Sequence, residues 1–372
     1  MMVKVGINGF GRIGRLAFRI GTLKHAGELQ FGAINTSGSM DSAGWAHLTN
    51  YDTMYREFEL KVQSEELNAP DQATDEDPLI GNLMISEKDI KVPLLAQKDP
   101  AKIPWGKYGV DVVIEATGKF TDSEGAMKHA VGGAKRVVIS APAKGGNVGT
   151  YVLGVNESEG KEPQGMVISN ASCTTNCVAP VAAVLHSAFG IEKAMMTTVH
   201  SYTDDQNLQD SSHKDLRRAR AAAENIIPTS TGAAIATTET IPELKGLFDG
   251  MSLRVPTATG SITDFTVLLK KNVTKEEVNE AFKKAVKNPL YKGILAISEG
   301  NLVSSDIIGR SESAIVDLPL TQVVAGNMVK VFAWYDNEWG YANRLVEQVI
   351  RVGRTLESSK IPTDPITMSF KQ

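Results

Sequence analysis

The chain has 372 residues, of which 42% are hydrophobic and 22% are charged, and 39 Lys and Arg against 43 Asp and Glu leave a net charge of -4. This length favours two domains with a cleft between them over a single domain. The balanced charge gives no support for a nucleic-acid-binding surface, although it leaves room for a local basic pocket.

Cysteine content and hydropathy indicate the cellular compartment of the protein. Cys173 and Cys177 are its two cysteines, which excludes a disulfide framework and indicates a reducing compartment. The opening MMVKVGINGF has a strand pattern and lacks the layout of a secretion signal. No apolar run approaches the roughly 20 residues of a membrane helix. We therefore expect a cytoplasmic protein without membrane or nucleic-acid partners.

The first third of the chain alternates strand and helix patterns. Apolar runs at residues 3–8 and 29–35 flank residues 12–24, where apolar side chains recur with helical spacing. Two later runs, residues 110–116 and 136–141, are typical of buried parallel strands. This alternation predicts an open, doubly wound sheet whose ligands lie at the carboxyl ends of its strands.

An acidic segment interrupts the alternation. Residues 59–105 do not continue the alternating strand and helix pattern. Within them, residues 69–78 (APDQATDEDP) are acidic and flanked by prolines. We interpret that stretch as a solvated loop inserted in the first domain, with little information about chemistry.

From residue 166 onward the pattern changes to half-exposed strands mixed with helices. Strands are expected at residues 166–169, 194–202, 251–256, 262–270 and 328–334, and helices at 178–189, 275–286 and 341–355. Thr274 and Glu277 form a capping-box pattern at the start of the second of these helices. The segment therefore predicts a second domain of different construction.

A glycine-rich turn follows the first strand. Residues 9–14 (GFGRIG) fit the pattern G-x-G-x-x-G between a strand and a helix. There, glycines allow a tight turn and bring backbone N–H groups against a pyrophosphate at the positive end of the helix. We therefore expect Gly9 and Gly11 at a dinucleotide.

The acid that usually follows the second strand of such a site is missing. It would bind the ribose 2′-hydroxyl, but residues 33–39 (AINTSGS) are neutral. Without a carboxylate to repel a 2′-phosphate, donors of Thr36, Ser37 or Ser39 are able to bind one. This favours NADP, or use of both NADP and NAD; a plain serine-rich turn is the alternative.

Cys173 lies where a strand pattern passes into a helix, in the run SNASCTTNC. A helix N-terminus stabilises an anion, and lowering the thiol pKa from about 8.5 by about two units makes the thiolate the main form at neutral pH. His200, at the end of a predicted strand, is the candidate partner for this shift. The alternative is core packing of Cys173. The remaining histidines fall in helical or loop patterns: His25, His47, His129, His186 and His213.

Several strings go beyond generic chemistry. They are KVGINGFGRIGR from residue 4, ASCTTNC from 171, TVHSYT from 198, NIIPTSTGAA from 225, RVPT from 254 and WYDNEWGY from 334. In this order, and over nearly the whole chain, the sequence closely resembles the phosphorylating glyceraldehyde-3-phosphate dehydrogenases.

The resemblance implies a two-step reaction at Cys173. The thiol attacks the aldehyde carbon while His200 activates it and shuttles protons. The thiohemiacetal then gives a hydride to the nicotinamide, and inorganic phosphate cleaves the resulting thioester to 1,3-bisphosphoglycerate. The phosphate-binding residues it implies are Ser172, Thr174, Thr203, Arg218, Thr231, Gly232 and Arg254. The cofactor residues it adds are Arg12, Ile13, Lys98, Thr117, Ser140 and Asn337.

The resemblance and the patterns together predict the architecture. We expect an α/β protein with a Rossmann-type doubly wound parallel-sheet domain and an α+β catalytic domain with a mixed sheet. The dinucleotide-binding domain is expected at residues 1–171, with a C-terminal helix at 338–372 packing back on it, and the catalytic domain at 172–337. The resemblance also implies a homotetramer. No metal site is expected.

Departures from the family bear on the cofactor. Thr36 stands where NAD-using members usually carry Asp, and Ser211 and Ser212 stand where they carry Leu-Pro. Because the family places this loop beside a neighbouring subunit's cofactor, Ser212 is expected to reach a 2′-phosphate across the interface. The segment at residues 59–93 is longer than usual for the family.

Alternative activities are less well supported. Erythrose-4-phosphate dehydrogenase, which hydrolyses its thioester, is the nearest one, but the intact STGAA at residues 230–234 favours phosphorolysis. Aspartate-semialdehyde dehydrogenase needs none of the phosphate-binding strings. A non-catalytic RNA-binding role gains nothing from the balanced charge.

Overall fold

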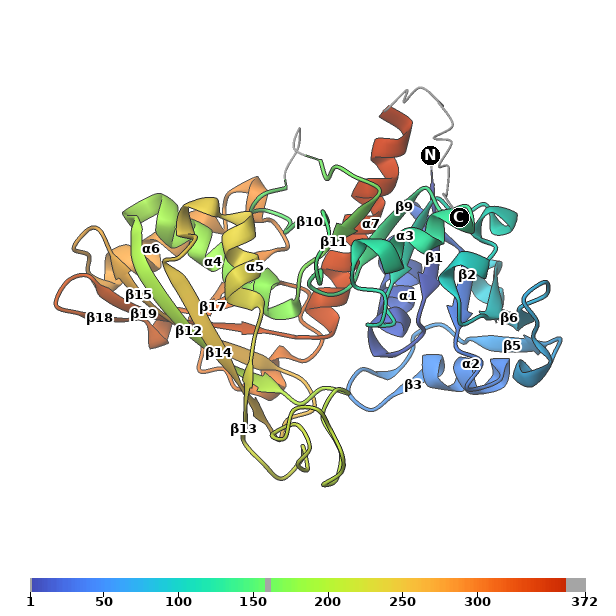
Figure 1. The fold of residues 1–372 in the computed structure, drawn as a ribbon. Helices are drawn as coiled ribbons and strands as arrows, with labels where there is room; N and C mark the ends of the chain where they lie inside the picture. The colour runs from blue at the N-terminus through green and yellow to red at the C-terminus, as the bar shows by residue number, and fades with distance from the viewer. Residues whose placement is uncertain (1, 158–161, 359–372) are drawn as a thin grey trace, which may run out of the picture.

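The structure, a computed structural model, describes residues 2–157 and 162–358. Figure 1 shows two lobes, each built on its own sheet, with the long helix α7 (Trp339–Ser358) between them. Among the helices of these described residues, none has both the length and the hydropathy that a bilayer span requires.

The N-terminal lobe contains a nine-stranded sheet in the order β10-β11-β9-β8-β1-β2-β7-β6-β5. Its strands are β1 (Val3–Asn8), β2 (Leu29–Thr36), β5 (Gln63–Glu66), β6 (Leu79–Ile85), β7 (Ile90–Ala96), β8 (Val112–Glu115), β9 (Arg136–Ile139), β10 (Gly149–Thr150) and β11 (Val167–Ser169). The strands from β10 to β7 pair in parallel, and the last two pairs, β7/β6 and β6/β5, are antiparallel. The predicted parallel sheet is confirmed.

Helices cover both faces of this sheet. They are α1 (Arg12–Lys24), α2 (Ser42–Asn50), α3 (Ser123–Val131) and α7, and β3 (Tyr51–Asp52) and β4 (Arg56–Glu57) form a separate ribbon. Leu16 and Ile20 of α1 and Leu345 of α7 are buried in one cluster with strand residues. Ala126 of α3 and Trp105 are buried in another cluster. Burial of a Leu or Ile side chain in these clusters contributes about 1.5–3 kcal/mol, because apolar surface is removed from water.

The acidic stretch is an exposed connection, as predicted, but the strands on either side of it were not predicted. Asp71, Asp75 and Asp77 are exposed in the loop between β5 and β6, which contains one 3-10 turn. Ile80 of β6 and Val92 of β7 are buried in the same cluster as Trp45 of α2, which packs against β5 and β6. The surrounding region therefore extends the sheet.

The C-terminal lobe contains a mixed sheet in the order β13-β14-β12-β15-β19-β17-β16, with β18 paired to β19. Its strands are β12 (Ile191–Ser201), β13 (Ile227–Ser230), β14 (Phe248–Val255), β15 (Ser261–Leu269), β16 (Leu295–Ser298), β17 (Ala314–Asp317), β18 (Gln322–Val324) and β19 (Met328–Tyr335). Pairs β12/β14 and β16/β17 are parallel, and the remaining pairs are antiparallel. The predicted mixed sheet is confirmed.

Three helices pack on this second sheet: α4 (Cys173–Phe189), α5 (Ala233–Thr240) and α6 (Lys275–Ala285). Helix α4 begins five residues earlier than residue 178, the predicted start. Its polar first turn is buried and hydrogen-bonded, so it has no amphipathic pattern that sequence periodicity detects. Thr274 and Glu277 form the predicted capping box of α6.

The last described helix packs on the N-terminal lobe. Leu345 and Val349 of α7 belong to the same buried cluster as Val5 and Ile7 of β1. The remainder of the predicted C-terminal segment, residues 359–372, lies outside the described residues.

Candidate active site

Cys173 and His200 lie in contact. Cys173 is the first residue of α4 and His200 lies near the end of β12, and their Sγ and Nε2 atoms are 3.3 Å apart. His200 is 3% exposed, whereas Cys173 remains partly accessible. An imidazole at this distance is able to exchange a proton with the thiol.

A strained turn places the thiol at the helix end. Ala171 has φ +55, in the left-handed region that is unfavourable for a residue with a side chain. The turn is held by the Tyr341 hydroxyl, which donates to Ala171 O over 3.0 Å, and by Ser169 Oγ, which accepts from Ala171 N over 3.0 Å. Ser172 Oγ then caps the helix by accepting from Thr175 N.

Arg254 lies against the other ring nitrogen of His200. Its Nη1 is 2.6 Å from His200 Nδ1 and donates to Ser201 O over 3.1 Å, while Nδ1 is 2.7 Å from the same carbonyl. An Arg only donates and a carbonyl only accepts, so Nδ1 satisfies one neighbour or the other but not both. Arg254 Nε is buried and has no hydrogen-bond partner among the described residues. Arg254 is therefore able to bind an anion beside His200 and the Ser201 carbonyl.

The protonation states differ from the sequence prediction. Burial, reinforced by the Arg254 charge, lowers the pKa of His200 to about 3, so the imidazole is neutral at neutral pH. Burial raises the pKa of the Cys173 thiol, and the nearby Arg254 charge opposes this shift only in part. The prediction of a thiol pKa lowered by two units is therefore wrong for this structure. The pair is a neutral thiol beside a neutral base.

Tyr335 is a buried neighbour that sequence reasoning missed. Its hydroxyl lies 2.9 Å from Thr174 Oγ1 and 2.8 Å from Thr198 Oγ1. Its ring meets the His200 ring edge-on, with centroids 5.9 Å apart. Tyr335 therefore braces both α4 and the imidazole; its place in the string WYDNEWGY was the available signal.

The expected phosphate-binding residues do not all lie beside the thiol. The hydroxyls of Ser172 and Thr174 are engaged within the protein, in the helix cap and with Tyr335. Arg254 is beside His200, whereas Thr231 and Gly232 lie at the start of α5. The structure thus joins only part of the predicted set to the thiol.

The Asp205 carboxylate interacts with two of the other residues expected to bind phosphate. Thr203 Oγ1 donates to Asp205, and the Arg218 guanidinium forms an ion pair with the same carboxylate. Arg218 Nε also lies 3.4 Å from Asp215. An incoming phosphate has to compete with Asp205 for Arg218. The sequence analysis did not single out Asp205.

The glycine-rich turn has the shape expected of a pyrophosphate cradle. Gly9 has φ +96, and a Cβ at Gly14 would lie 2.1 Å from Gly9 O, so neither position tolerates a side chain. Gly11 is the N-cap residue of α1, and a Cβ there would meet no atom within 4 Å. The helix N-terminus is therefore open to a ligand and lined by N–H groups.

Two expected cofactor residues are already engaged. Arg12 pairs with Asp52 over 2.9 Å and with Glu338, just before α7, over 2.5 Å, so its guanidinium already has two carboxylate partners. Thr36 Oγ1 donates to Leu95 O over 3.0 Å and accepts from Gly38 N. Its hydroxyl is therefore unavailable to a 2′-phosphate. Ser37 and Ser39 are exposed, and Ile13 packs against the core.

A continuous chain of hydrogen bonds crosses the carboxyl ends of four parallel strands. We call it the strand-end relay, and it consists of Thr117, Glu115, Asn8, Asn35, Gln97 and Asp75. Thr117 N donates to Glu115 Oε1 over 2.8 Å, and Asn8 Nδ2 donates to Glu115 Oε2 over 2.6 Å. Asn35 Nδ2 donates to Asn8 Oδ1, Gln97 N donates to Asn35 Oδ1, and Gln97 Nε2 donates to Asp75 Oδ1. The relay fixes the edge at which dinucleotides bind.

His129 belongs to the support of this relay. Trp105 Nε1 donates to His129 Nδ1 over 3.0 Å, and because an indole N–H only donates, the ring hydrogen lies on Nε2. Nε2 then donates to Glu115 Oε2 over 2.9 Å. The structural role predicted for His129 agrees with this buried position.

The remaining expected cofactor residues are placed as follows. Asn337 Oδ1 accepts from Gly260 N over 3.1 Å and from Ser261 Oγ over 2.9 Å, which leaves its Nδ2 group to donate. The backbone N of Ser140 donates to a relay residue's carbonyl, Glu115 O. Lys98 and Ser212 are exposed.

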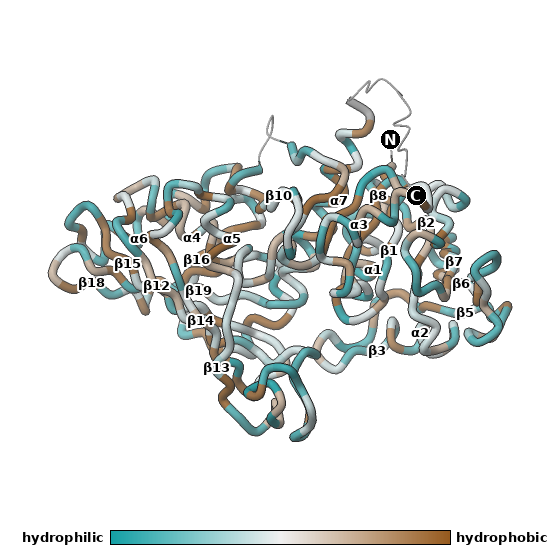
Figure 2. The backbone as a smooth tube through the Cα atoms, in the orientation of Figure 1, coloured by the Kyte–Doolittle hydropathy of each residue, from teal (hydrophilic) through white to brown (hydrophobic). Residues whose placement is uncertain are grey.

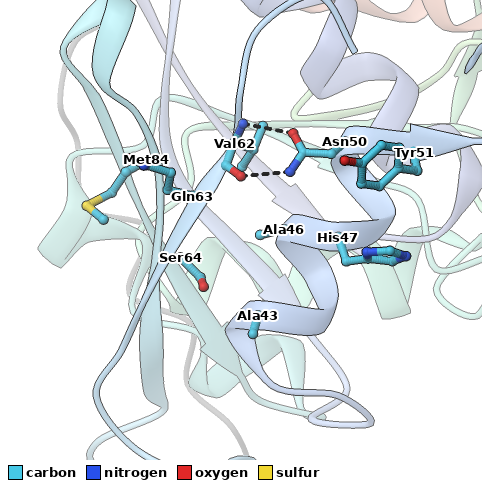
Figure 3. Close-up of a pocket in the computed structure, with 9 residues that line it drawn as sticks. All are labelled: Ala43, Ala46, His47, Asn50, Tyr51, Val62, Gln63, Ser64 and Met84. Carbon is cyan, nitrogen blue, oxygen red and sulfur yellow. Dashed lines mark hydrogen bonds between the residues drawn. The ribbon is translucent and has the colours of Figure 1, made fainter. Parts of the chain in front are cut away.

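A groove of about 580 Å³ lies away from the thiol, between α2 and strands β5 and β6 (Figure 3). Its lining residues are Ala43, Ala46, His47, Asn50, Tyr51, Val62, Gln63, Ser64 and Met84. Asn50 is held there by two hydrogen bonds with the Val62 backbone. None of the expected site residues lines this groove, and it carries no catalytic assignment.

Comparison with known proteins gives a consistent result over both lobes. Residues 3–123 match the family model described as glyceraldehyde 3-phosphate dehydrogenase, NAD binding domain, and residues 172–337 match the model of the C-terminal domain. The chain is 51% identical over 356 residues to a glyceraldehyde-3-phosphate dehydrogenase of Streptomyces coelicolor, covering 96% of this chain and 100% of that protein. It is 49% identical over 346 residues to glyceraldehyde-3-phosphate dehydrogenase 1 of Bacillus cereus, covering 93% and 97%. It is 47% identical over 346 residues to the chloroplastic glyceraldehyde-3-phosphate dehydrogenase B of Pisum sativum, covering 93% and 73%.

Proposed function

Because the chain belongs to the glyceraldehyde-3-phosphate dehydrogenase family, we propose that it converts glyceraldehyde 3-phosphate, phosphate and NAD(P)+ to 1,3-bisphosphoglycerate at Cys173 and His200. The observation that carries this assignment is the 3.3 Å contact between Cys173 Sγ and His200 Nε2, beside the Arg254 guanidinium. A nicotinamide dinucleotide supplies the hydride acceptor when it is bound.

In the first step Sγ adds to the aldehyde carbon and forms a thiohemiacetal. His200 Nε2 takes the thiol proton as the C–S bond forms, which suits a neutral imidazole and a protonated thiol. Addition of sulfur converts a planar carbon into a tetrahedral one that is able to release hydride. The product of oxidation is a thioester on Cys173.

In the second step inorganic phosphate attacks the thioester carbon and Cys173 leaves as a thiolate, which regains its proton from His200. Arg254 supplies permanent charge and a planar fork of donors, and its unpaired Nε supports a role at a substrate phosphate. Arg218, Thr203, Thr231 and Gly232 complete the proposed phosphate-binding set, with Ser172 and Thr174 acting through α4.

Binding of a phosphate by Arg254 also changes His200. When the guanidinium turns towards an anion, Nδ1 is left with Ser201 O as its single partner, 2.7 Å away. Nδ1 then carries the hydrogen, so the Nε2 lone pair faces the thiol. Substrate binding and activation of the base are thereby linked through one side chain.

The cofactor proposal is NADP, or both NADP and NAD. The N-terminal end of α1 is open at Gly11, and no carboxylate occupies position 36. Since the Thr36 hydroxyl is engaged, the exposed hydroxyls of Ser37 and Ser39 are the local donors, and Ser212 is the proposed donor from a neighbouring subunit. Asn337 Nδ2 is the proposed donor to the nicotinamide carboxamide oxygen, and Lys98, Thr117 and Ser140 are the proposed contacts along the dinucleotide.

We further propose a cytoplasmic homotetramer with domains divided between residues 171 and 172. Figure 2 shows apolar stretches on the loop between β12 and β13, where Leu208, Leu216 and Ile226 are 78%, 81% and 68% exposed. Large exposed apolar side chains support a subunit contact there. A reduced Cys173 requires a reducing compartment.

Initial-rate measurements test the proposed reaction. Oxidation of glyceraldehyde 3-phosphate should require inorganic phosphate, and Cys173→Ala should abolish it while leaving dinucleotide binding within about twofold. Phosphate-independent turnover with erythrose 4-phosphate would instead support the hydrolytic alternative. Turnover by Cys173→Ala would refute the mechanism.

Comparing kcat/KM for NADP and NAD in the wild type and in Thr36→Asp tests the cofactor proposal. A carboxylate at this position repels a 2′-phosphate and binds a 2′-hydroxyl, so preference should move towards NAD by about tenfold. An unchanged ratio would contradict it.

A further inference from the structure

The acidic connection between β5 and β6 lies against the end of β2. A Cβ built on Gly38, whose φ is +75, would lie 3.7 Å from Pro70 O. At the other end of the connection, Ala96 N donates to Pro78 O over 2.8 Å, which ties it to the end of β7. The connection therefore borders residues 36–39, where a 2′-substituent of the adenosine ribose is expected.

One carboxylate anchors the connection to the strand-end relay. Asp75 Oδ1 accepts from Gln97 Nε2 over 3.0 Å, and Asp75 Oδ2 pairs with Lys102. The Gln97 backbone exchanges two hydrogen bonds with the Asn35 side chain, at 2.8 and 3.0 Å. Asn35 directly precedes Thr36, so the connection is fixed to the strand that carries the cofactor-selecting position.

Three further acids lie on this connection, and one of them, Glu76, also interacts electrostatically with Lys102. Asp71, Glu76 and Asp77 are exposed, and none has a side-chain hydrogen bond or ion pair among the described residues. Asp71 follows Pro70 directly, and consecutive Cα atoms are about 3.8 Å apart. The backbone of one acidic residue, Asp71, therefore adjoins the contact between Pro70 and Gly38.

We propose that Asp71, Glu76 and Asp77 form an electrostatic selection element that weakens binding of NADP relative to NAD. This inference rests on the proposed function. A 2′-phosphate carries up to two negative charges that NAD lacks, so the repulsion acts on NADP alone. The neutral residue at position 36 admits NADP, and the acidic connection restrains it, so that use of both cofactors results from two opposed features.

The test is a charge-neutralising triple variant, Asp71→Asn/Glu76→Gln/Asp77→Asn, in the full chain. Its matched control is Glu87→Gln/Glu243→Gln/Glu280→Gln, which removes the same charge from exposed positions outside the connection. Dissociation constants for NADP and NAD are measured by calorimetry at about 20 mM and 500 mM ionic strength. Because the Debye length falls from roughly 20 Å to 4 Å over this range, a through-space effect fades with salt.

The expected result at low salt is NADP binding tightened by about fivefold in the triple variant, with NAD unchanged within twofold, and a difference below about twofold at high salt. The control should change neither ratio. Equal changes for both cofactors, a salt-independent change, no change, or the same change in the control would each overturn the proposal. Failure of every variant and the wild type to bind either dinucleotide would instead overturn the proposed function.

Discussion

The candidate active site and the strand-end relay are both polar and, apart from Asp75 at the exposed end of the relay, largely buried, but they use hydrogen bonds in opposite ways. Along the relay, each Glu115 oxygen has two donors and each amide has a partner. At the candidate active site, Arg254 Nε lacks a partner within the described part of the chain, and His200 Nδ1 faces two neighbours that make incompatible demands. A satisfied network holds a binding edge rigid, whereas an unsatisfied one is completed only by a ligand. This difference in hydrogen bonding distinguishes the supporting strand-end relay from the candidate active site.

Removing the base should produce the largest effect. In His200→Asn, kcat/KM for glyceraldehyde 3-phosphate should fall by about 10²–10⁴-fold because proton transfer from the thiol is lost. Dinucleotide affinity, which depends on the other region, should stay within about twofold. His47→Asn, at an exposed site, is the control. If His200→Asn lost dinucleotide affinity to an extent similar to its loss of kcat/KM, the two regions would not be separate.

Replacing Arg254 should affect phosphorylated substrate selectively. Arg254→Gln should lower kcat/KM for glyceraldehyde 3-phosphate by about 10²-fold, since a charge-assisted contact with phosphate is lost, and that for unphosphorylated glyceraldehyde by less than about fivefold. Arg217→Gln, an exposed neighbour of the other proposed arginine, should leave both values unchanged. Equal losses with the two aldehydes would assign Arg254 a purely structural role.

Burial of a neutral His200 predicts a pH dependence of stability. The pKa is about 3 in the folded protein and about 6.5 when unfolded, so between these values only the unfolded state binds the proton. Stability should therefore fall as the pH drops below 6.5, by about 2 kcal/mol at pH 5. The free energy of unfolding, measured in urea at pH 7 and pH 5 for the wild type and His200→Asn, tests this loss of stability. A loss of equal size in the variant would show that other groups are responsible.

Perturbing the relay should have a smaller effect, confined to the cofactor. In Glu115→Gln an amide N–H2 replaces one acceptor and faces donors of Thr117 or of Asn8 and His129. We expect dinucleotide Kd to rise by about 5–10-fold and kcat at saturating cofactor to change by less than twofold. Glu124→Gln, exposed on α3, is the control. A large fall in kcat with unchanged Kd would contradict the division between the two regions.

Much of the fold followed from local pattern. Apolar runs gave β1, β2 and β11 nearly residue for residue, and the glycine spacing gave the turn before α1. Helix α4 was predicted five residues too short, because its first turn is polar yet buried. The strands β6 and β7 were missed because their burial depends on contacts with other parts of the chain, such as the packing of α2 against β6.

The sequence by itself determined the chemical types at the site: one thiol before a helix, one histidine at a strand end, a glycine turn, and no acid at position 36. These are properties of residues and their neighbours in the chain. Only the tertiary structure decided how they are protonated and which are free, because burial and the approach of Arg254 set the pKa values of Cys173 and His200. It also brought the acidic connection to the end of β2, a contact between distant segments that local pattern does not encode.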